Sequence, residues 1–356
     1  MGGTTAKGCV IQGGRIDKAT TFEVARRHRF KKGSGIPLRI PVIDIMEIGA
    51  GGGSIAKLDE MGLIQVGPQS AGASPGPACY GLGGEEPTVS DADLVLGFLN
   101  PDYFLGGEMH LDEPAARQAI ENRVAKRLGL TLEKAAWGIH ELVTENMAAA
   151  IQIHMAEKGV DPGRFTLVAF GGAGPVHAFA LAKRLGTRRI LIPPSAGIAS
   201  AFGLLVAPVS FDLVKTHRLT IDELDLSQMQ TLFQEMEAEG RSFVSRAETA
   251  EDVSFTRSLD ICYLGQGHSV NVPIPCAAGM PAKEDIRARF EQAYQVLYGR
   301  VYPDMDVELM NLRLVAHSAA PSLTLRKLEF RGARADGLKG KRSAYSGSTN
   351  GYLEYP

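Results

Sequence analysis

The chain has 356 residues, of which 44% are hydrophobic and 22% are charged, a composition that excludes wholesale disorder. The formal net charge of −2 argues against nucleic acid or an anionic membrane as a partner, because neither is attracted by a near-neutral surface. No apolar run reaches the length of about 18 residues that a membrane-spanning helix needs.

The first half of the chain alternates glycine-rich loops with helices. Short β-like runs occupy residues 8–45, and a long glycine-rich stretch fills residues 48–90. Ordered loops of that length usually carry function. A helical pattern starts at Asp91, and Asp112 is placed to cap a helix that runs to about residue 128. Thr131 then begins a long amphipathic helix that Gly159 ends.

Residues 165–192 predict a strand, a glycine turn, a helix and a second strand. The apolar run FTLVAF leads directly into Gly-Gly-Ala-Gly-Pro at 171–175, and the second strand covers 189–192. This order is typical of an α/β nucleotide-binding unit. Another glycine turn opens a helix over 198–205.

The remaining chain predicts an α+β domain with few chemically reactive groups. We expect helices over 225–248 and 283–297, and strands over 255–264, 268–274 and 308–317. The predicted organisation is an α/β core over residues 1–220, a smaller α+β C-terminal domain over 221–322 and a poorly ordered tail over 323–356.

The cysteines indicate the cellular compartment of the protein, and the two ends of the chain indicate whether it is part of a longer protein. Cys9, Cys79, Cys262 and Cys276 are scattered with no CxxC pair, which favours a reducing cytosol, and no signal peptide is present. We therefore expect a cytoplasmic protein. A Gly-Gly-Thr-Thr turn at residues 2–5 without a preceding strand, together with the tail, indicates a piece of something longer.

The 41 glycines exceed the usual share of about 7% and form three clusters that could bring backbone amides close to a ligand. In Gly2-Gly3-Thr4-Thr5, amides and hydroxyls are suited to phosphate; a hairpin turn is the alternative. Residues 49–53 with Ser54 form a flexible lid or an anion-binding nest, or else a loose loop. The turn at 171–174 follows a strand and precedes a helix, but its spacing excludes a Rossmann dinucleotide site and a Walker P-loop.

Taken together, these stretches resemble the hydantoinase A / 5-oxoprolinase family. The resemblance rests on MGGTTAK, IGAGGGSIAKLDEMGLIQVGPQSAGASPGPACYG, EPTVSDADLVLG, FTLVAFGGAGPVHAFALAKRLG and PPSAGIASAFGLL, and it extends through DICYLGQGHSVNVPIP to about residue 318. It implies an ATPase lobe of the actin/Hsp70/sugar-kinase type, here incomplete. It also implies ATP and Mg²⁺ as cofactors.

The resemblance implies roles for the glycine clusters and for partners. The cofactor-binding residues would be Gly2, Gly3, Thr4 and Thr5 as the second phosphate loop, Gly51, Gly52, Gly53 and Ser54 as a nest, and Gly171, Gly172 and Gly174 as the adenosine turn. The substrate would be a small cyclic amide, with a ketone and bicarbonate as the alternative. The partner would be a hydantoinase B-like subunit or further copies of the chain.

The chain also departs from the family pattern. The family's loop begins with an Asp before the Met, whereas here Met1 is the first residue, and the lobe with the first phosphate loop is missing. Such an acid orients the hydration shell of Mg²⁺. We therefore expect this chain alone to hydrolyse ATP poorly or not at all, and a fragment that only binds nucleotide or a partner remains a competing hypothesis.

Three side chains are candidate catalytic groups, each with a structural alternative. Asp59 is either an acid that orients substrate or a turn residue before Gly62. Asp91 either polarises a water or holds Mg²⁺, or it caps a helix beginning at Ala92. His177, in the first turn after the glycine turn, either contacts the ligand or packs. Cys79 is interpreted as a small buried thiol, and no metal ligands are predicted because nothing lies at metal spacing beside His154.

Overall fold

The computed structural model describes residues 1–19, 22–24, 27, 33–38, 40, 42–246, 252–276, 279–321 and 340–355. The chain divides into two compact units: unit 1 comprises Met1–Ala201 with Leu328–Pro356, and unit 2 comprises Phe202–Lys327. The division falls earlier than the boundary expected at residue 220, because a strand at 210–220 pairs within unit 2. Among the described residues, no helix is long and apolar enough to cross a membrane.

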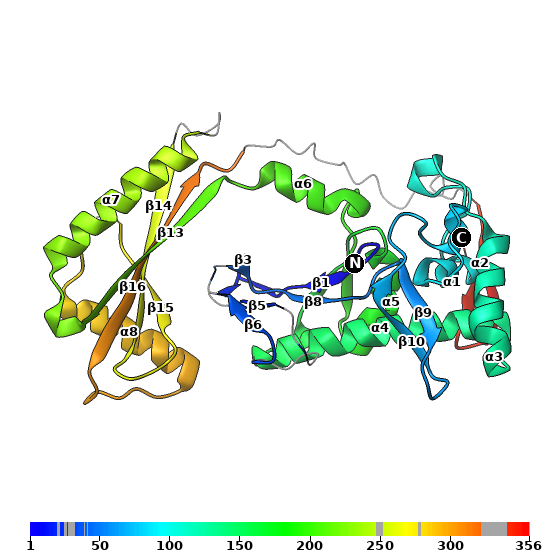
Figure 1. The fold of residues 1–356 in the computed structure, drawn as a ribbon, viewed down its shortest axis with the longest axis horizontal. Coiled ribbons are helices and arrows are strands. Elements are labelled where there is room, and N and C mark those ends of the chain that lie inside the picture. Colours follow the sequence, from blue (N-terminus) through cyan, green and yellow to red (C-terminus); the bar gives the residue numbers. More distant parts are fainter. Residues whose placement is uncertain are drawn as a thin grey trace. The chain divides into compact units, whose positions relative to one another are not determined.

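Unit 1 is a mixed α/β structure whose N-terminal part consists of short antiparallel pairs (Figure 1). The pairs are β1 (Ala6–Gly8) with β8 (Met46–Ile48), β2 (Ile11–Gln12) with β3 (Arg15–Ile16), β4 (Lys18–Ala19) with β7 (Val42–Ile43), β5 (Phe22–Val24) with β6 (Ile36–Leu38), and β9 (Ser54–Leu58) with β10 (Ile64–Ser70).

The helices of unit 1 begin and end close to where the sequence predicts. They are α1 (Val89–Val95), α2 (Glu113–Ile120), α3 (Lys126–Leu128), α4 (Leu132–Glu157), α5 (Gly174–Leu185) and α6 (Ala199–Val206), the last running across the division between the units. A π-helical turn, η3 (Glu121–Ala125), joins α2 to α3. Short 3₁₀ turns are η1 (Ala78–Tyr80), η2 (Leu105–Gly107), η4 (Pro162–Arg164) and η5 (Ala196–Ile198).

Two predicted helix caps are confirmed. The side chain of Asp112 accepts a hydrogen bond from the amide of Ala115 at 2.9 Å, and that of Thr131 accepts one from the amide of Lys134 at 3.3 Å. Each satisfies a helix N-terminal amide that has no partner within the helix.

The long helix α4 forms the centre of the core of unit 1. Its buried residues include Ile139, Val143 and Met147, which pack with residues of α1 and α5 in one cluster. The recurrence of these residues at three- and four-residue steps is what places them on one face. Side chains from three helices therefore meet along α4.

The predicted strand–turn–helix–strand unit is confirmed. Strand β11 (Thr166–Val168) lies parallel to β12 (Arg189–Leu191), and α5 is the connection between them. The glycine turn at 171–174 lies at the end of β11 and opens α5. Parallel pairing requires such a crossover, which sets the glycine turn at the carboxyl end of the strand.

The end of the chain differs from the loosely ordered tail expected from composition. Strands β17 (Arg342–Ser346) and β18 (Gly351–Tyr355) form an antiparallel hairpin. The amide of Tyr345 donates to the carbonyl oxygen of Leu96, and the hydroxyl of Tyr352 donates to that of Val95, both at 2.8 Å. The hairpin is fixed by packing on α1, which local periodicity does not reveal. Residues 322–339 lie outside the described part of the chain.

Unit 2 is an antiparallel sheet packed with two helices. Its strand order is β13 (Ser210–Thr220), β16 (Val307–Ser318), β14 (Val253–Tyr263) and β15 (Val270–Ile274). Helices α7 (Leu226–Val244) and α8 (Lys283–Tyr298) cover the core, and η6 (Ile221–Glu223) precedes α7. Both helices and three of the strands match the prediction. Strand β13 was missed because Lys215 and His217 interrupt its apolar alternation.

Candidate functional site

The structure brings all three glycine clusters into one place in unit 1. The amide of Gly52 donates to the carbonyl oxygen of Gly2 at 3.0 Å, and the amide of Gly53 donates to that of Gly3 at 2.6 Å. The loop at 49–54 thus runs against the N-terminal turn, backbone to backbone.

Close packing explains why the second cluster is glycine. A Cβ on Gly51 would stand 2.5 Å from the carbonyl carbon of Gly3, and one on Gly52 would stand 2.7 Å from Oγ of Ser90. A Cβ on Gly53 would stand 3.0 Å from the carbonyl oxygen of Gly3, a less severe contact. A side chain at Gly51 would therefore separate the two loops, so these glycines serve the architecture.

The third cluster joins through Met1. The carbonyl oxygen of Met1 accepts hydrogen bonds from the amides of Ala173 at 3.2 Å and Gly174 at 3.1 Å. Gly171 has a φ of +90° and its missing Cβ would collide with the same carbonyl oxygen. The turn that opens α5 therefore lies beside the N-terminal turn.

Three glycines of these clusters have no such structural explanation. A Cβ on Gly2, Gly3 or Gly172 would meet no atom of the described chain within 4 Å, and none of the three has a left-handed φ. Neither packing nor backbone conformation requires glycine there. Their bare backbone faces open space, where a ligand can approach it closely.

The hydroxyls predicted at the site have different surroundings. Oγ of Ser54 is buried and accepts a hydrogen bond from the amide of Gly51 at 2.9 Å, so it stabilises its own loop. Thr4 is exposed, with its hydroxyl 3.4 Å from that of Ser70. The carbonyl oxygen of Thr5 accepts from the amide of Gly2 at 3.0 Å and closes the N-terminal turn.

Asp59 lies in the turn between β9 and β10. One carboxylate oxygen accepts from the amides of Met61 and Leu63, both at 2.9 Å. This arrangement is the side-chain turn that Asp commonly forms, and it matches the structural alternative weighed for this residue.

Asp91 is fully buried and its carboxylate is satisfied by the protein. It accepts from the amide and hydroxyl of Thr88 at 2.8 and 2.7 Å, and from the amides of Cys79 at 2.7 Å and Ala78 at 3.3 Å. Thr88, not Asp91, is the N-cap of α1, and the two form a reciprocal capping box. Burial, and secondarily the charge of Asp91, raises the pKa of the Cys79 thiol.

His177 is also fully buried, and it contacts two residues that the sequence analysis missed. Nδ1 of His140 lies 2.7 Å from Oδ1 of Asp93, and Nε2 of His177 lies 3.4 Å from Oδ2 of the same carboxylate. The imidazole rings of His140 and His177 stack with centroids 4.5 Å apart. Although burial by itself would raise the pKa of Asp93, the two histidines outweigh it and hold that pKa at about 2.

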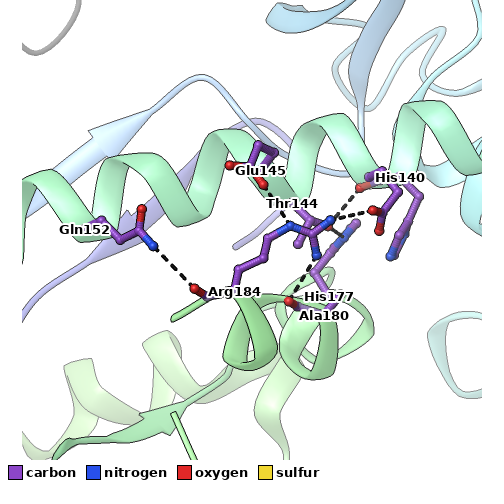
Figure 2. Close-up of polar contacts among 8 residues, drawn as sticks. His140, Thr144, Glu145, Gln152, His177, Ala180 and Arg184 are labelled. Carbon is purple, nitrogen blue, oxygen red and sulfur yellow. Dashed lines mark hydrogen bonds and ion pairs between the residues drawn. The ribbon is translucent and has the colours of Figure 1, made fainter. Parts of the chain in front are cut away.

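The contacts between α4 and α5 hold this cluster in register (Figure 2). Arg184 on α5 pairs with Glu141 at 2.5 Å and with Glu145 at 2.9 Å on α4, while Oγ1 of Thr144 lies 3.0 Å from Nδ1 of His177. Only the spacing of His140 and Thr144, four residues apart on one helix face, was visible in the sequence. Nothing local joins them to Asp93 or His177.

Comparison with known proteins agrees with this arrangement of motifs. Residues 1–213 match the family model described as hydantoinase/oxoprolinase. The chain belongs to the hydantoinase/oxoprolinase family. The resemblance seen in its sequence motifs is thereby confirmed.

Two sequence relatives and two solved structures place the chain within this family. It is 38% identical over 317 residues to an uncharacterised protein of Methanocaldococcus jannaschii (88% of this chain, 45% of that protein). It is 37% identical over 317 residues to the caprolactamase subunit alpha of Pseudomonas jessenii (88% and 44%). The ATP-dependent caprolactamase structure from that organism superimposes with a TM-score of 0.72 at 33% identity (100% of this chain, 51% of that one).

A nucleotide-free acetone carboxylase structure, from work on ATP-dependent acetone carboxylation, superimposes with a TM-score of 0.80 at 25% identity. The match covers 99% of this hydantoinase/oxoprolinase family chain and 51% of the acetone carboxylase chain. The chain thus spans about half the length of the relatives it matches.

Proposed function

We propose that this chain is the ATP-binding part of an ATP-dependent cyclic-amide hydrolase of the hydantoin or 5-oxoproline type. The observation that carries the proposal is the set of glycines at 2, 3 and 172, whose bare backbones face open space where three glycine loops meet. Backbone amides in such loops are suited to phosphate oxygens. The relatives described as ATP-dependent support the same reading.

In this proposal the three loops have separate tasks. Residues 2–5 would bind phosphate oxygens through amides and the exposed Thr4 hydroxyl, and the turn at 171–174 would lie against the adenosine. The remaining loop holds the others together, because neighbouring atoms already occupy the space where a Cβ would stand on Gly51, Gly52 and Gly53. We further propose that the core is a lobe of the actin/Hsp70/sugar-kinase type, in line with the glycine turn that opens α5.

The proposed chemistry needs positioning more than a protein nucleophile. Transfer of the γ-phosphoryl group of ATP to the amide oxygen converts a poor electrophile into one that water opens. Because Asp59 and Asp91 are bound into a turn and a helix cap, the geometry gives neither a free carboxylate for this step. The glycine loops also contain no acidic residue, so any Mg²⁺ here would be held through phosphate oxygens and hydroxyls.

We also propose a partner that completes the reaction, of the hydantoinase B-like kind. The βαβ unit exposes apolar side chains at its strands: Val168, Phe170, Leu191 and Ile192 are each between 42% and 54% exposed. Exposed apolar side chains grouped in this way are typical of surfaces that another polypeptide chain covers. The caprolactamase relative is itself named as a subunit.

Carboxylation of a ketone with ATP and bicarbonate is the second candidate, favoured by the superposition on acetone carboxylase. The test starts from protein purified from its native source together with whatever co-purifies. ATP-dependent ring opening of 5-oxoproline, hydantoin or caprolactam, with phosphate released in step, is the expected result. Carboxylation of acetone without lactam opening would favour the second candidate, and absence of any ATP binding would contradict both.

A further inference from the structure

A buried cluster of three potential ligands lies inside unit 1, apart from the open glycines. Asp93 comes from α1, His140 from α4 and His177 from α5, and their side chains are 3%, 3% and 1% exposed. Each offers a ligand atom, and these atoms all lie within 4.8 Å of one another.

The hydrogen bonds of Thr144 fix the protonation of His177. Oγ1 of Thr144 donates to the carbonyl oxygen of His140 at 2.8 Å, so it has only lone pairs left for Nδ1 of His177, 3.0 Å away. Nδ1 must therefore carry the ring hydrogen. This tautomer is assigned from the hydrogen-bond network.

The other nitrogen of His177, Nε2, consequently makes no hydrogen bond. It is buried, and in the neutral ring its lone pair faces Oδ2 of Asp93 at 3.4 Å. Two electron-rich atoms that face one another away from water require a cation between them. That cation is either a proton on Nε2 or a metal ion.

We propose that Asp93, His140 and His177 bind one divalent transition-metal ion, with zinc as the best fit. Two imidazole nitrogens and a carboxylate oxygen suit zinc and its neighbours, whereas Mg²⁺ and Ca²⁺ prefer oxygen ligands. Tetrahedral zinc with bonds of about 2.0–2.2 Å spaces its ligand atoms about 3.3 Å apart. Nε2 of His177 lies 3.4 Å from Oδ2 of Asp93, close to this spacing, whereas Nδ1 of His140 lies against the other carboxylate oxygen, Oδ1.

Metal binding replaces the hydrogen that His140 and Asp93 now share. Their 2.7 Å separation must widen by about 0.6 Å to reach ligand spacing. His140 then carries its hydrogen on Nε2 and ligates through Nδ1.

The surroundings of the cluster resemble those that orient metal ligands. Thr144 holds the ring of His177 through the nitrogen opposite to the ligating one. Trp137 stacks on the ring of His140 with centroids 5.5 Å apart, and Phe98 packs edge-on at 5.0 Å. These contacts shield the rings from water. Because the rings of His140 and His177 stack nearly parallel, one of them must turn for both nitrogens to face one ion.

An ion at this site would join three helices, two of which contact or open from the glycine loops. The amide of Ser90, in the first turn of α1, donates to the carbonyl oxygen of Gly52 at 2.7 Å, and α5 opens directly from the turn at 171–174. The ion would stabilise the ends of both loops. The inference stands whether or not the chain acts on a cyclic amide.

The test uses the full chain after dialysis against a chelator. Zn²⁺ is titrated while the ratio of bound ion to protein is measured, and Co²⁺ is used as a spectroscopic substitute. Trp137 is the sole tryptophan, and it stacks on His140, so its fluorescence reports on this site. We expect one ion per chain, visible absorption from bound Co²⁺ and quenching of Trp137 by Co²⁺.

Variants separate this site from other thiol and histidine sites. His177→Gln should weaken binding by more than about 100-fold, and Thr144→Val, which keeps all three ligands, by about 10–100-fold. The matched control is His110→Gln, since His110 is exposed and pairs with the equally exposed Asp102. This variant should bind the ion as the wild type does.

Three results would overturn the proposal. In the first, wild-type protein stripped of metal takes up no ion at micromolar Zn²⁺. In the second, Co²⁺ binds but does not quench the fluorescence of Trp137. In the third, His177→Gln binds Zn²⁺ as tightly as the wild type does. Should His177→Gln fail to fold by circular dichroism, wild-type stoichiometry, Trp137 quenching and Thr144→Val decide. Absence of an ion would assign the cation to a proton on His177.

Discussion

The backbone of Gly51 lies directly against that of Gly3, so that a Cβ on Gly51 would stand 2.5 Å from the Gly3 carbonyl carbon and from the Thr4 amide nitrogen. Two loops separated by nearly fifty residues thereby become one surface. Glycines at this surface fall into two kinds: those that let the loops pack, and those whose backbone faces open space.

Substitution at a packed glycine should destabilise the fold. Gly51→Ala is expected to lower the free energy of unfolding by about 1–3 kcal/mol, because neighbouring backbone cannot yield without separating the loops. Urea unfolding followed by circular dichroism measures the change. Gly172→Ala is the control, since its Cβ meets nothing, and it should unfold as the wild type does. Equal stability of the two variants would contradict the packing argument.

Substitution at an open glycine should affect ligand binding instead. Gly172→Ala is expected to keep the fold and to weaken ATP binding by about tenfold or more, because the methyl group occupies space proposed for the nucleotide. Calorimetric titration with ATP measures this. Gly267→Ala, an equally open position in unit 2, should bind ATP normally. Unchanged affinity in Gly172→Ala would remove this turn from the proposed site.

Asp91→Asn should act through stability, because the carboxylate accepts hydrogen bonds from two segments at once. In Asn, an NH₂ group replaces one of the two carboxylate oxygens, so a hydrogen-bond donor would face a buried N–H donor. The expected loss in unfolding free energy is about 1–3 kcal/mol. Urea unfolding compares Asp91→Asn with Asp59→Asn. The loss in unfolding free energy should be smaller for Asp59→Asn, because Asp59 lies in a half-exposed turn. A large loss of turnover at unchanged stability would instead make Asp91 catalytic.

Cys79 should be unreactive in the folded protein. Burial, and then the nearby Asp91 carboxylate, raise the pKa of its thiol, so at mildly alkaline pH it remains protonated and inaccessible. Exposed Cys276 should react with iodoacetamide first, and Cys79 only after unfolding. Peptide mass mapping of labelled sites measures the order. Early labelling of Cys79 would show that its segment opens in the native state.

Removal of residues 340–356 should uncover Trp137. Gly347 lies against the Trp137 indole, and Tyr345 packs with it at a centroid distance of 5.8 Å. Loss of the hairpin is expected to shift tryptophan emission to longer wavelength and to lower the melting temperature. Tyr352→Phe removes one hydrogen bond, costs about 0.5–1.5 kcal/mol and should leave the emission unchanged. An unshifted spectrum after truncation would contradict the packing.

The amino-acid sequence by itself determined the elements whose signals are local. The caps at Asp112 and Thr131, the apolar face of α4 and the glycine turn before α5 depend on residues within a few positions of each other. The same local motifs sufficed to place the chain in its family. They also marked every glycine cluster that the structure brings together.

Tertiary structure decided what depends on residues distant in the chain. Strand β13 is stabilised by pairing with β16 about a hundred residues later, and the C-terminal hairpin by hydrogen bonds to α1. Which glycines are packed and which are open depends on the neighbouring loop. Asp93, His140 and His177 meet because three helices pack along one core. Only this packing buries Nε2 of His177 where it makes no hydrogen bond.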